Sequence, residues 1–205
     1  MTESKVQKLW EDFLNPEVLR SNLIIASLYI AAFEFLKSTI VDRIRSFYVI
    51  GFDQNGLRID PEYQTAVLLK NRSPVYASLE WLKKSQAIDD NDIAVFERVK
   101  KCRNGFAHAI TGMLMSGLPS DLPARFSEMV SLLDKIELWW IVNVEITTDP
   151  QFDGQEIDEE GIIPGPIIGL RLMMDIALGS EEDSRKYLDE FMRRTRLVTP
   201  PNAAV

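Results

Sequence analysis

The hydrophobic positions of this chain recur mainly with the period of an α-helix. From Asn15 and Pro16 onward, apolar residues return every three or four positions, and no Gly or Pro interrupts them up to about Val49. Asn followed by Pro and Glu is a strong helix start, because Asn can accept a backbone N–H and Pro has none to satisfy. The pattern therefore predicts one long helix of some nine turns, carried by Leu19, Leu23, Ala26, Ile30, Phe33, Ile40 and Ile44.

Helical patterning also dominates the rest of the chain. We predict further helices at 5–14, 61–71, 74–85, about 92–113, 124–146, 166–178 and 181–196. Residues 51–60 are predicted to form a loop, because Gly51 and the Asn55-Gly56 pair break the pattern, with a short hairpin as the alternative. The fold class expected is all-α: an antiparallel helical bundle with one long early helix and a C-terminal helical extension.

Charge is distributed unevenly along the 205 residues and divides them into two regions. The net charge is −8, but residues 149–183 hold ten acidic residues and one basic residue, so the remainder is close to neutral. We expect a helical bundle over 1–148, then an acidic connector and C-terminal helices packing on the same domain over 149–205. Overall acidity argues against nonspecific nucleic-acid binding, although local basic patches are still compatible with it. The acidic run is interpreted as a solvated connector, with mimicry of nucleic acid as the alternative.

The cysteine and histidine content limits which disulfides and metal sites the chain can form. Cys102 is the one cysteine and His108 the one histidine, which argues against an internal disulfide and against the usual zinc sites. We expect no metal and no cofactor. The most apolar stretch, 22–41, is interrupted by Glu34 and Lys37, which favours a buried helix over a membrane span. These features indicate a cytoplasmic protein that does not enter a membrane.

The histidine closes the run RNGFAH, residues 103–108. If the helix continues to Met113, His108 lies roughly 160° from Phe106 and so away from the core face, on the same side as Lys101 and Asn104. The predicted core stripe contains Val95, Val99, Cys102, Phe106, Ile110 and Met113. Two structural alternatives stay open: a solvated histidine on a polar face, and a helix stop at Asn104-Gly105, since both residues tolerate left-handed backbone.

Arg103 and His108 together suit phosphodiester chemistry. An imidazole exchanges protons near neutral pH, and a guanidinium makes paired hydrogen bonds to phosphate oxygens. RNA carries its own nucleophile, the ribose 2′-hydroxyl. A protein that moves protons and offsets charge on the pentavalent phosphorus can therefore cleave it.

This arrangement resembles the HEPN domain family, whose signature is Arg, a favoured Asn, Asp or His, and a His after a gap of four to six residues. Residues 103–108 match it, Ala107 precedes the His, and the charged lead-in 97–102 and the long early helix are similar too. The resemblance covers about residues 15–147. Glu34 corresponds to a glutamate often found in the long helix of such domains.

The resemblance implies a metal-independent endoribonuclease acting on single-stranded RNA as a homodimer with facing motifs. Arg103 would bind the scissile phosphate, His108 would act as general base or acid, and Asn104 would fix their geometry, supported by Glu34. Three nearby residues would steer the RNA backbone: Arg98, Lys100 and Lys101. Such domains occur in toxin–antitoxin pairs, phage defence and RNA processing, so an antitoxin protein is a further expected partner.

The alternative reading is a noncatalytic HEPN-like helical module that binds a nucleotide or a protein partner. Two further features have both a structural and a functional interpretation. The four tryptophans are expected to pack in the core or an interface rather than stack on bases: Trp10, Trp81, Trp139 and Trp140. The basic segment 185–196 is interpreted as a surface helix, with contact to RNA or a partner as the alternative.

Overall fold

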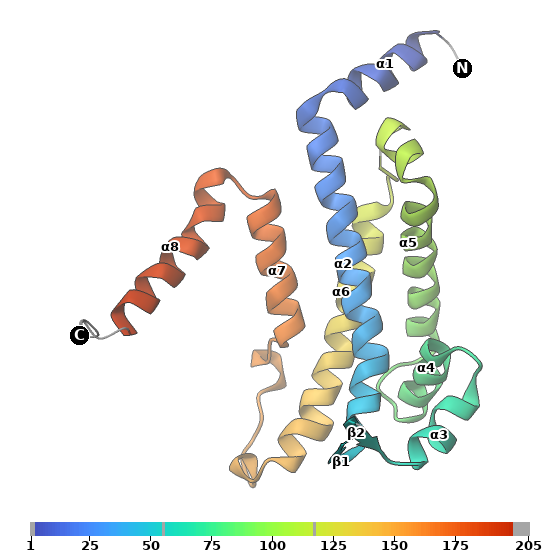
Figure 1. The fold of residues 1–205 in the computed structure, drawn as a ribbon, viewed down its shortest axis with the longest axis vertical. Coiled ribbons are helices and arrows are strands. Elements are labelled where there is room, and N and C mark those ends of the chain that lie inside the picture. Colours follow the sequence, from blue (N-terminus) through green and yellow to red (C-terminus); the bar gives the residue numbers. More distant parts are fainter. Residues whose placement is uncertain (1–2, 55, 117, 199–205) are drawn as a thin grey trace.

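The computed structural model describes residues 3–54, 56–116 and 118–198, with side chains except at 3–6, 12, 107–116, 181, 183 and 196–198. This described part is mostly helical, in agreement with the predicted all-α class. Its α-helices are α1 Glu3–Leu14, α2 Pro16–Phe47, α3 Glu62–Ala66, α4 Pro74–Lys84, α5 Asp90–Ser116, α6 Leu122–Trp140, α7 Gly165–Leu178 and α8 Glu181–Val198. Helices α2, α5, α6 and α7 run side by side in alternating directions along the chain (Figure 1).

Local capping sets the starts of the two helices that carry the candidate site. At α2, the backbone N–H of Glu17 donates to Asn15 Oδ1 at 3.0 Å, as the Asn-Pro-Glu signal predicts. At α5, Asp89 and Asp92 cap reciprocally: each side chain accepts from the other residue's backbone N–H, at 2.8 and 3.0 Å. These bonds satisfy donors that a helix end otherwise leaves without partners.

Helix α5 continues through Asn104-Gly105 to Ser116, so the predicted alternative of a helix stop is wrong. Phe106, fully buried, follows directly and packs on Tyr29 with ring centroids 5.3 Å apart. Tertiary packing of this kind outweighs the cost of about 1 kcal/mol that a glycine adds to a helix interior.

Residues 49–53 and 56–59 form a hairpin, so the alternative to the predicted loop is the one that the structure adopts. Strand β1, Val49–Asp53, pairs antiparallel with β2, Gly56–Ile59, and Phe52 lies opposite Leu57. Gly51 and Gly56 have φ of 146° and 110°, which residues with a side chain rarely adopt. The side chains are largely exposed on both faces, so no alternation of polar and apolar residues marked the strands.

Two predicted helices are interrupted in the structure. The segment predicted as one helix over 61–71 is α3 followed by a 3-10 turn, Leu68–Lys70, with buried Val67 between them at ψ −70°. The segment predicted as 124–146 changes at Trp140 into a π-helix, Ile141–Ile146. That stretch is rich in β-branched residues, which fit a regular α-helix less well.

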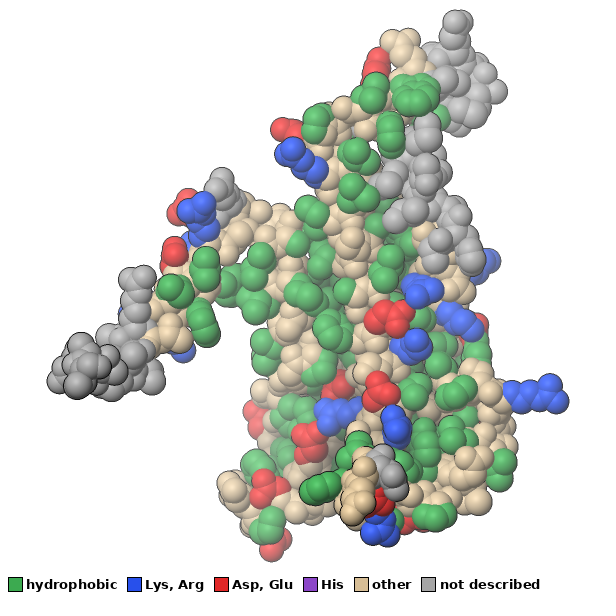
Figure 2. Space-filling model, in the orientation of Figure 1, with side chains coloured by type: hydrophobic (Ala, Val, Ile, Leu, Met, Phe, Trp, Pro, Cys, Tyr) green, Lys and Arg blue, Asp and Glu red, His purple; other side chains and the backbone are tan. Residues whose placement is uncertain are grey.

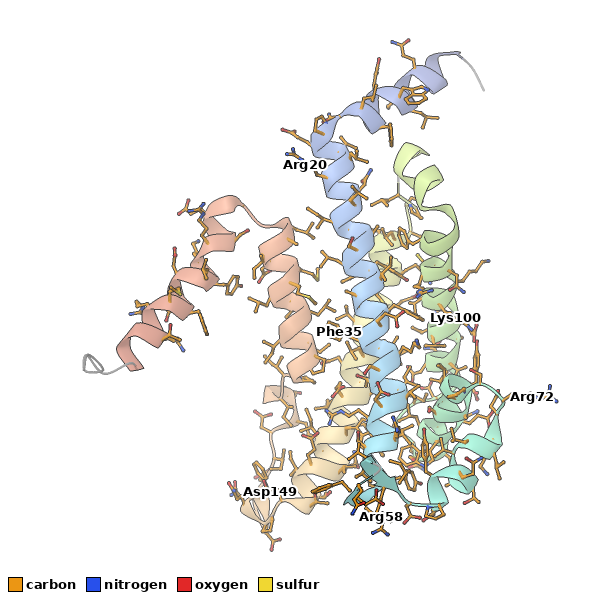
Figure 3. All side chains as sticks on the ribbon, in the orientation of Figure 1. Arg20, Phe35, Arg58, Arg72, Lys100 and Asp149 are labelled. Atoms are coloured by element: carbon orange, nitrogen blue, oxygen red, sulfur yellow. The ribbon has the colours of Figure 1, made fainter. Side chains whose placement is uncertain are left out.

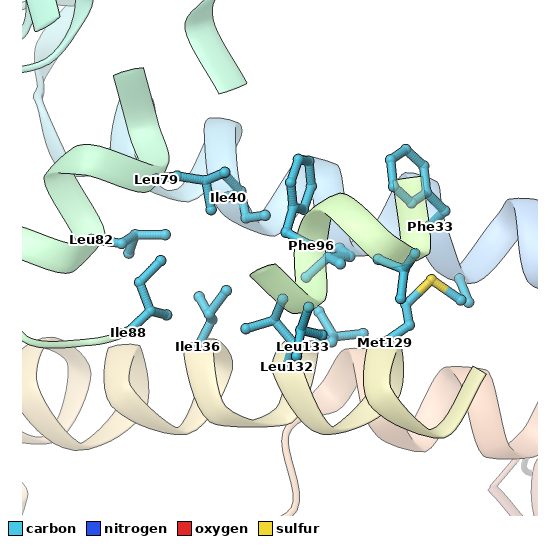
Figure 4. Close-up of a cluster of buried hydrophobic side chains, with 14 of the residues drawn as sticks. Phe33, Ile40, Leu79, Leu82, Ile88, Phe96, Met129, Leu132, Leu133 and Ile136 are labelled. Carbon is cyan, nitrogen blue, oxygen red and sulfur yellow. The ribbon is translucent and has the colours of Figure 1, made fainter. Parts of the chain in front are cut away.

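The core lies between α2, α4, α5 and α6 (Figures 1 and 4). Helix α2 passes through its centre, which agrees with the reading of its apolar stretch as a buried helix. The side chains that Figure 4 labels are Phe33, Ile40, Leu79, Leu82, Ile88, Phe96, Met129, Leu132, Leu133 and Ile136.

Three tryptophans extend this core where α4 packs against the end of α6: Trp81, Trp139 and Trp140. The rings of Trp81 and Trp140 stack at 5.7 Å with planes 9° apart, and Trp139 packs edge-on against both. Trp140 is 2% exposed. The prediction of packing in the core is therefore confirmed for these three residues, whereas Trp10 on α1 is 48% exposed and packs only against Phe13 among the described aromatic rings.

A buried carboxylate joins α2 to α6. Glu137, with 2% of its side chain exposed, accepts a hydrogen bond from Thr39 at 2.6 Å and forms an ion pair with Arg43. Arg43 also pairs with Glu145 in the π-helix, and these partners hold its pKa above the usual value although partial burial opposes that shift. The network fixes the position of α6 against α2.

The chain leaves the bundle through the acidic segment and returns along α7. Short 3-10 turns at Pro150–Phe152 and Glu159–Gly161 interrupt residues 149–164, and no longer element occurs there. Helix α7 packs along α2 and α6, and α8 contacts α7 and then leads away from the bundle (Figure 1).

Within the part of the chain that the structure describes, two segments, Pro16–Phe47 and Glu159–Leu178, are long and apolar enough to cross a membrane on length and composition alone. In the first, 44% of the apolar window is buried inside the protein, as in a core helix; in the second, 17% is buried. The low burial of the second segment identifies α7 as the apolar helix with the less complete cover.

Candidate functional site

Helix α5 presents a core face and a polar face, as its sequence predicts. Val95, Val99 and Phe106 are at most 9% exposed, Cys102 is half-buried, and Lys101 is exposed. The core stripe is confirmed for these residues, and the side chains of Ile110 and Met113 lie outside the described residues. The polar face therefore carries the residues singled out for RNA.

The Arg103 side chain contacts α2. Its Nη2 donates to Glu34 Oε1 at 2.9 Å, and the guanidinium carbon lies 5.7 Å from the centre of the Phe33 ring. Arg103 Nε is buried and has no hydrogen-bond partner among the described residues. The contact joins two residues that are 69 positions apart in the sequence, and it brings together two of the predicted site residues.

Glu34 is held between two cations. Besides Arg103, Lys37 Nζ donates to Glu34 Oε2 at 3.3 Å. Partial burial would raise the pKa of Glu34, but the hydrogen bonds from Arg103 and Lys37 outweigh burial and lower the pKa below its ordinary value. Glu34 is therefore ionised at neutral pH and neutralises part of the positive charge beside it.

A shallow depression of about 450 Å³, which we call the basic groove, lies along α5. It is lined by Glu97, Arg98, Lys100, Lys101 and Asn104. Lys and Arg side chains gather on this part of the surface together with a few carboxylates (Figure 2). The structure thus places Asn104 and the three predicted RNA-steering residues at one depression.

The cations of the basic groove differ in how far they are engaged. Arg98 pairs with Glu128 of α6 at 3.1 Å, so its charge is partly offset. Lys100, labelled in Figure 3, donates to the Tyr76 hydroxyl at 2.5 Å and lies 4.6 Å from the centre of that ring. The hydrogen bond with Tyr76 raises the pKa of Lys100, against the smaller effect of burial. Lys101 is exposed to solvent.

His108 lies within α5, but its side chain is outside the described residues. Five positions in an uninterrupted helix correspond to about 7.5 Å along the axis and about 140° around it. Positions 103 and 108 of one chain therefore point from different sides of the same helix.

Sequence reasoning missed Phe33, Tyr76 and Glu128 as neighbours of the site. Each of these side chains contacts a site residue because α2, α4 or α6 packs on α5, and no local sequence pattern predicts such a contact. Among the described side chains, no group of three or more His, Cys, Asp or Glu residues is arranged to hold a metal ion.

Comparison of this chain with models of protein families, with curated proteins and with solved structures finds no match in any of the three.

Proposed function

We propose that this protein is a metal-independent endoribonuclease of the HEPN type, which cleaves single-stranded RNA as a cytoplasmic homodimer. The observation that carries the proposal is the contact between Arg103 and Glu34. It links the arginine of the RNGFAH motif to the one glutamate that the resemblance picks out of the long helix.

Arg103 would bind the scissile phosphate and offset charge on the pentavalent phosphorus. Glu34 occupies one donor on Nη2, and a guanidinium has five N–H donors, so Arg103 keeps further donors for phosphate oxygens. A preorganised cation of this kind stabilises a developing charge without having to reorient during the reaction. Glu34 would act as a positioning residue through Arg103.

His108 would move the protons. As general base it removes the 2′-hydroxyl proton while the bond from that oxygen to phosphorus forms and the bond from phosphorus to the 5′-oxygen breaks. The leaving 5′-oxygen takes a proton from a general acid, a role suited to His108 of a second copy. The products are a 2′,3′-cyclic phosphate and a 5′-hydroxyl.

The basic groove would guide the RNA backbone toward Arg103. Lys101 is free to meet a phosphate directly, and Tyr76 holds Lys100 in a fixed place. Arg98 would contribute less because Glu128 already pairs with it. Asn104 lines the same groove and would orient either the phosphate or a neighbouring side chain.

A shared site explains the spacing of the motif along α5. Positions 103 and 108 lie on different sides of one helix, and two copies that face each other would let the arginine of one approach the histidine of the other. A ribonuclease of this kind would suit a toxin or a component of phage defence or RNA processing, and an antitoxin protein is then an expected partner.

The test is cleavage of a single-stranded RNA in the presence of a chelator. Wild-type protein should cut it, and His108→Ala and Arg103→Ala should each lower the rate at least 100-fold while the circular dichroism spectrum is unchanged. Arg58→Ala, an exposed arginine on the β-hairpin, is the matched control and should keep full activity. Activity that survives both the His108 and the Arg103 replacement would remove this site from consideration.

The second candidate is a noncatalytic HEPN-like module that binds a nucleotide or a protein partner. Two observations favour it: Glu34 already neutralises Arg103, and the whole chain carries a net charge of −8. Under this function, ligand binding is measurable for wild type and unchanged in His108→Ala, and neither protein cleaves RNA.

A further inference from the structure

A groove of about 740 Å³, which we call the apolar groove, lies between α2, α6 and α7. Leu28 and Leu122, which are 9% and 4% exposed, form its floor. Partly buried side chains that pack on the core form its walls, among them Ile25, Phe126 and Met174. Small-molecule sites in proteins are concave and mostly apolar, with volumes of about 300–1,000 Å³. The size and the lining of this groove are therefore those of a site for a small apolar ligand.

The apolar groove has one charged side chain among its described lining residues, Arg171 of α7, and no carboxylate. Arg171 forms no ion pair or hydrogen bond with another described residue. It is exposed, so its methylene stem can line the groove while the guanidinium remains at the edge in water. The hydroxyls of Ser127 and Ser131 on α6 also line the groove. An anionic group at this edge would therefore meet a cation whose charge is not already offset.

The polar and the apolar lining residues lie at different ends of the groove. Helices α6 and α7 run in opposite directions, so early residues of α7 lie level with later residues of α6 (Figure 1). Arg171 therefore lies at the same end as Ser131, whereas Leu178, 47% exposed, lies at the other end with Leu122. The seven positions from Arg171 to Leu178 correspond to about 10 Å along α7.

We infer that the apolar groove binds a medium-chain carboxylate, a linear acyl chain that ends in one ionised carboxyl group. The carboxylate would accept paired hydrogen bonds from the Arg171 guanidinium, whose planar fork matches two carboxylate oxygens, and a further one from the Ser131 hydroxyl. The acyl chain would extend along the groove toward Leu178, and each methylene that leaves water adds to the affinity. One charge on the ligand matches the one cation of the lining.

A peptide helix fits the apolar groove less well than an acyl chain does. Helices α2, α6 and α7 contact one another pairwise, so the groove follows the line along which packed helices meet. A helix with its side chains is about 10–12 Å across and would extend well beyond that line. An acidic peptide would also bring several charges to a groove that offers one cation. A single acyl chain is narrow enough to lie between the helices.

Binding in the apolar groove is independent of the proposed function. The groove shares no lining residue with the basic groove. Ligand binding is measured on the full chain without RNA, so a protein that cleaves no RNA can still bind the carboxylate. Failure of one proposal is therefore distinguishable from failure of the other.

The experiment is isothermal titration calorimetry of the full chain with decanoate near neutral pH, below the concentration at which decanoate forms micelles. Wild type should bind saturably at one site. Arg171→Gln should weaken binding at least about 10-fold, because charge-assisted hydrogen bonds to the carboxylate are lost. Arg72→Gln is the matched control: this arginine precedes α4, far from α7 (Figure 3), and its replacement should leave the affinity unchanged.

A second variant tests the apolar end. Leu178→Asp places a carboxylate beside the acyl chain and should also weaken binding at least about 10-fold. Leu69→Asp, at a 69% exposed position, is its control and should bind like wild type. Circular dichroism checks that each variant is folded, which we expect because all four side chains are exposed.

Three results would overturn the inference. The first is the absence of saturable decanoate binding by wild type. The second is binding that either Arg171→Gln or Leu178→Asp leaves unchanged, since the ligand would then lie elsewhere on the protein. The third is binding of 1-decanol as tight as that of decanoate, because the cation would then have no part in recognition.

Discussion

Arg103 on α5 donates through Nη2 to Glu34 on α2 at 2.9 Å, and among the described side chains this ion pair joins two candidate site residues from different helices. Both side chains are partly exposed, at 32% and 44%. The pair is thus accessible to a ligand and tied to the central helix of the bundle.

Replacement of Glu34 by Gln should change stability in a pH-dependent way. Because the pKa of Glu34 is lowered in the folded protein, its ionised form stabilises the fold above about pH 4.5, and this contribution disappears as the pH falls through the lowered pKa. We expect wild type to be more stable at pH 7 by less than about 1 kcal/mol, since the pair is exposed to solvent. Urea unfolding from pH 7 to pH 3 measures the difference, which should vanish at the acid end. A constant difference over this range would contradict the assignment.

The same Glu34→Gln variant should cleave RNA about tenfold more slowly if Glu34 positions Arg103. Substitution leaves a neutral amide that can still accept a hydrogen bond but attracts the guanidinium less. The measurement is the single-turnover rate with the protein in excess over the RNA and above the dissociation constant of the complex, which separates chemistry from binding. Glu80→Gln, an exposed glutamate on α4, serves as the control and should cleave at the wild-type rate.

Replacement of Arg43 by Met should destabilise the protein by about 3–5 kcal/mol. The change leaves the Glu137 carboxylate, only 2% exposed, without its cation inside the protein. The double variant Arg43→Met, Glu137→Leu should recover part of this loss, because it removes the unpaired charge. Urea denaturation measures all three proteins, and equal losses in the single and double variants would show that the ion pair is not the cause.

Phe106→Ala should lower the free energy of unfolding by about 3–5 kcal/mol. Phe106 is fully buried against Tyr29, and its loss leaves a cavity that the helices fill only partly. Phe52→Ala, at an 83% exposed position, should change stability by less than about 0.5 kcal/mol. This pair of variants separates the structural residue inside the RNGFAH run from its proposed catalytic neighbours.

RNA binding by the basic groove should depend on salt through a small number of lysines. Replacing Lys100 and Lys101 by Gln should weaken binding and reduce the slope of log K against log salt by about 1–2. Lys83→Gln with Lys84→Gln, on the exposed end of α4, is the matched control. A slope unchanged by the groove substitutions would place the RNA elsewhere on the protein.

Much of the fold could be predicted because local signals define it. The Asn15 cap and Pro16 fix the start of α2, and the reciprocal Asp89 and Asp92 caps fix that of α5. The hairpin could be predicted only as an alternative to a loop, since Gly51 interrupts the strand pattern and neither face is buried enough to impose an alternation of polar and apolar residues. The π-helix after Trp140 depends on backbone register, which side-chain periodicity does not specify.

The site was predictable only in part, for a physical reason. Arg103, Asn104 and Lys101 share one helix, so their spacing places them on adjoining faces. Glu34 was linked to them by resemblance, because helical periodicity contains no information about which residue of α2 meets α5. The contact of Tyr76 with Lys100 arises where α4 packs beside α5, and it has no local signature.

In the proposed reaction the ribose 2′-hydroxyl attacks the neighbouring phosphate while the protein supplies a cation and proton transfer. The most direct measurement compares a short RNA with the same RNA carrying one 2′-deoxy residue at the mapped cleavage position, both in chelator. Wild type should cut the first to a 2′,3′-cyclic phosphate and leave that linkage of the second intact. Cleavage of the 2′-deoxy linkage at a similar rate would contradict it.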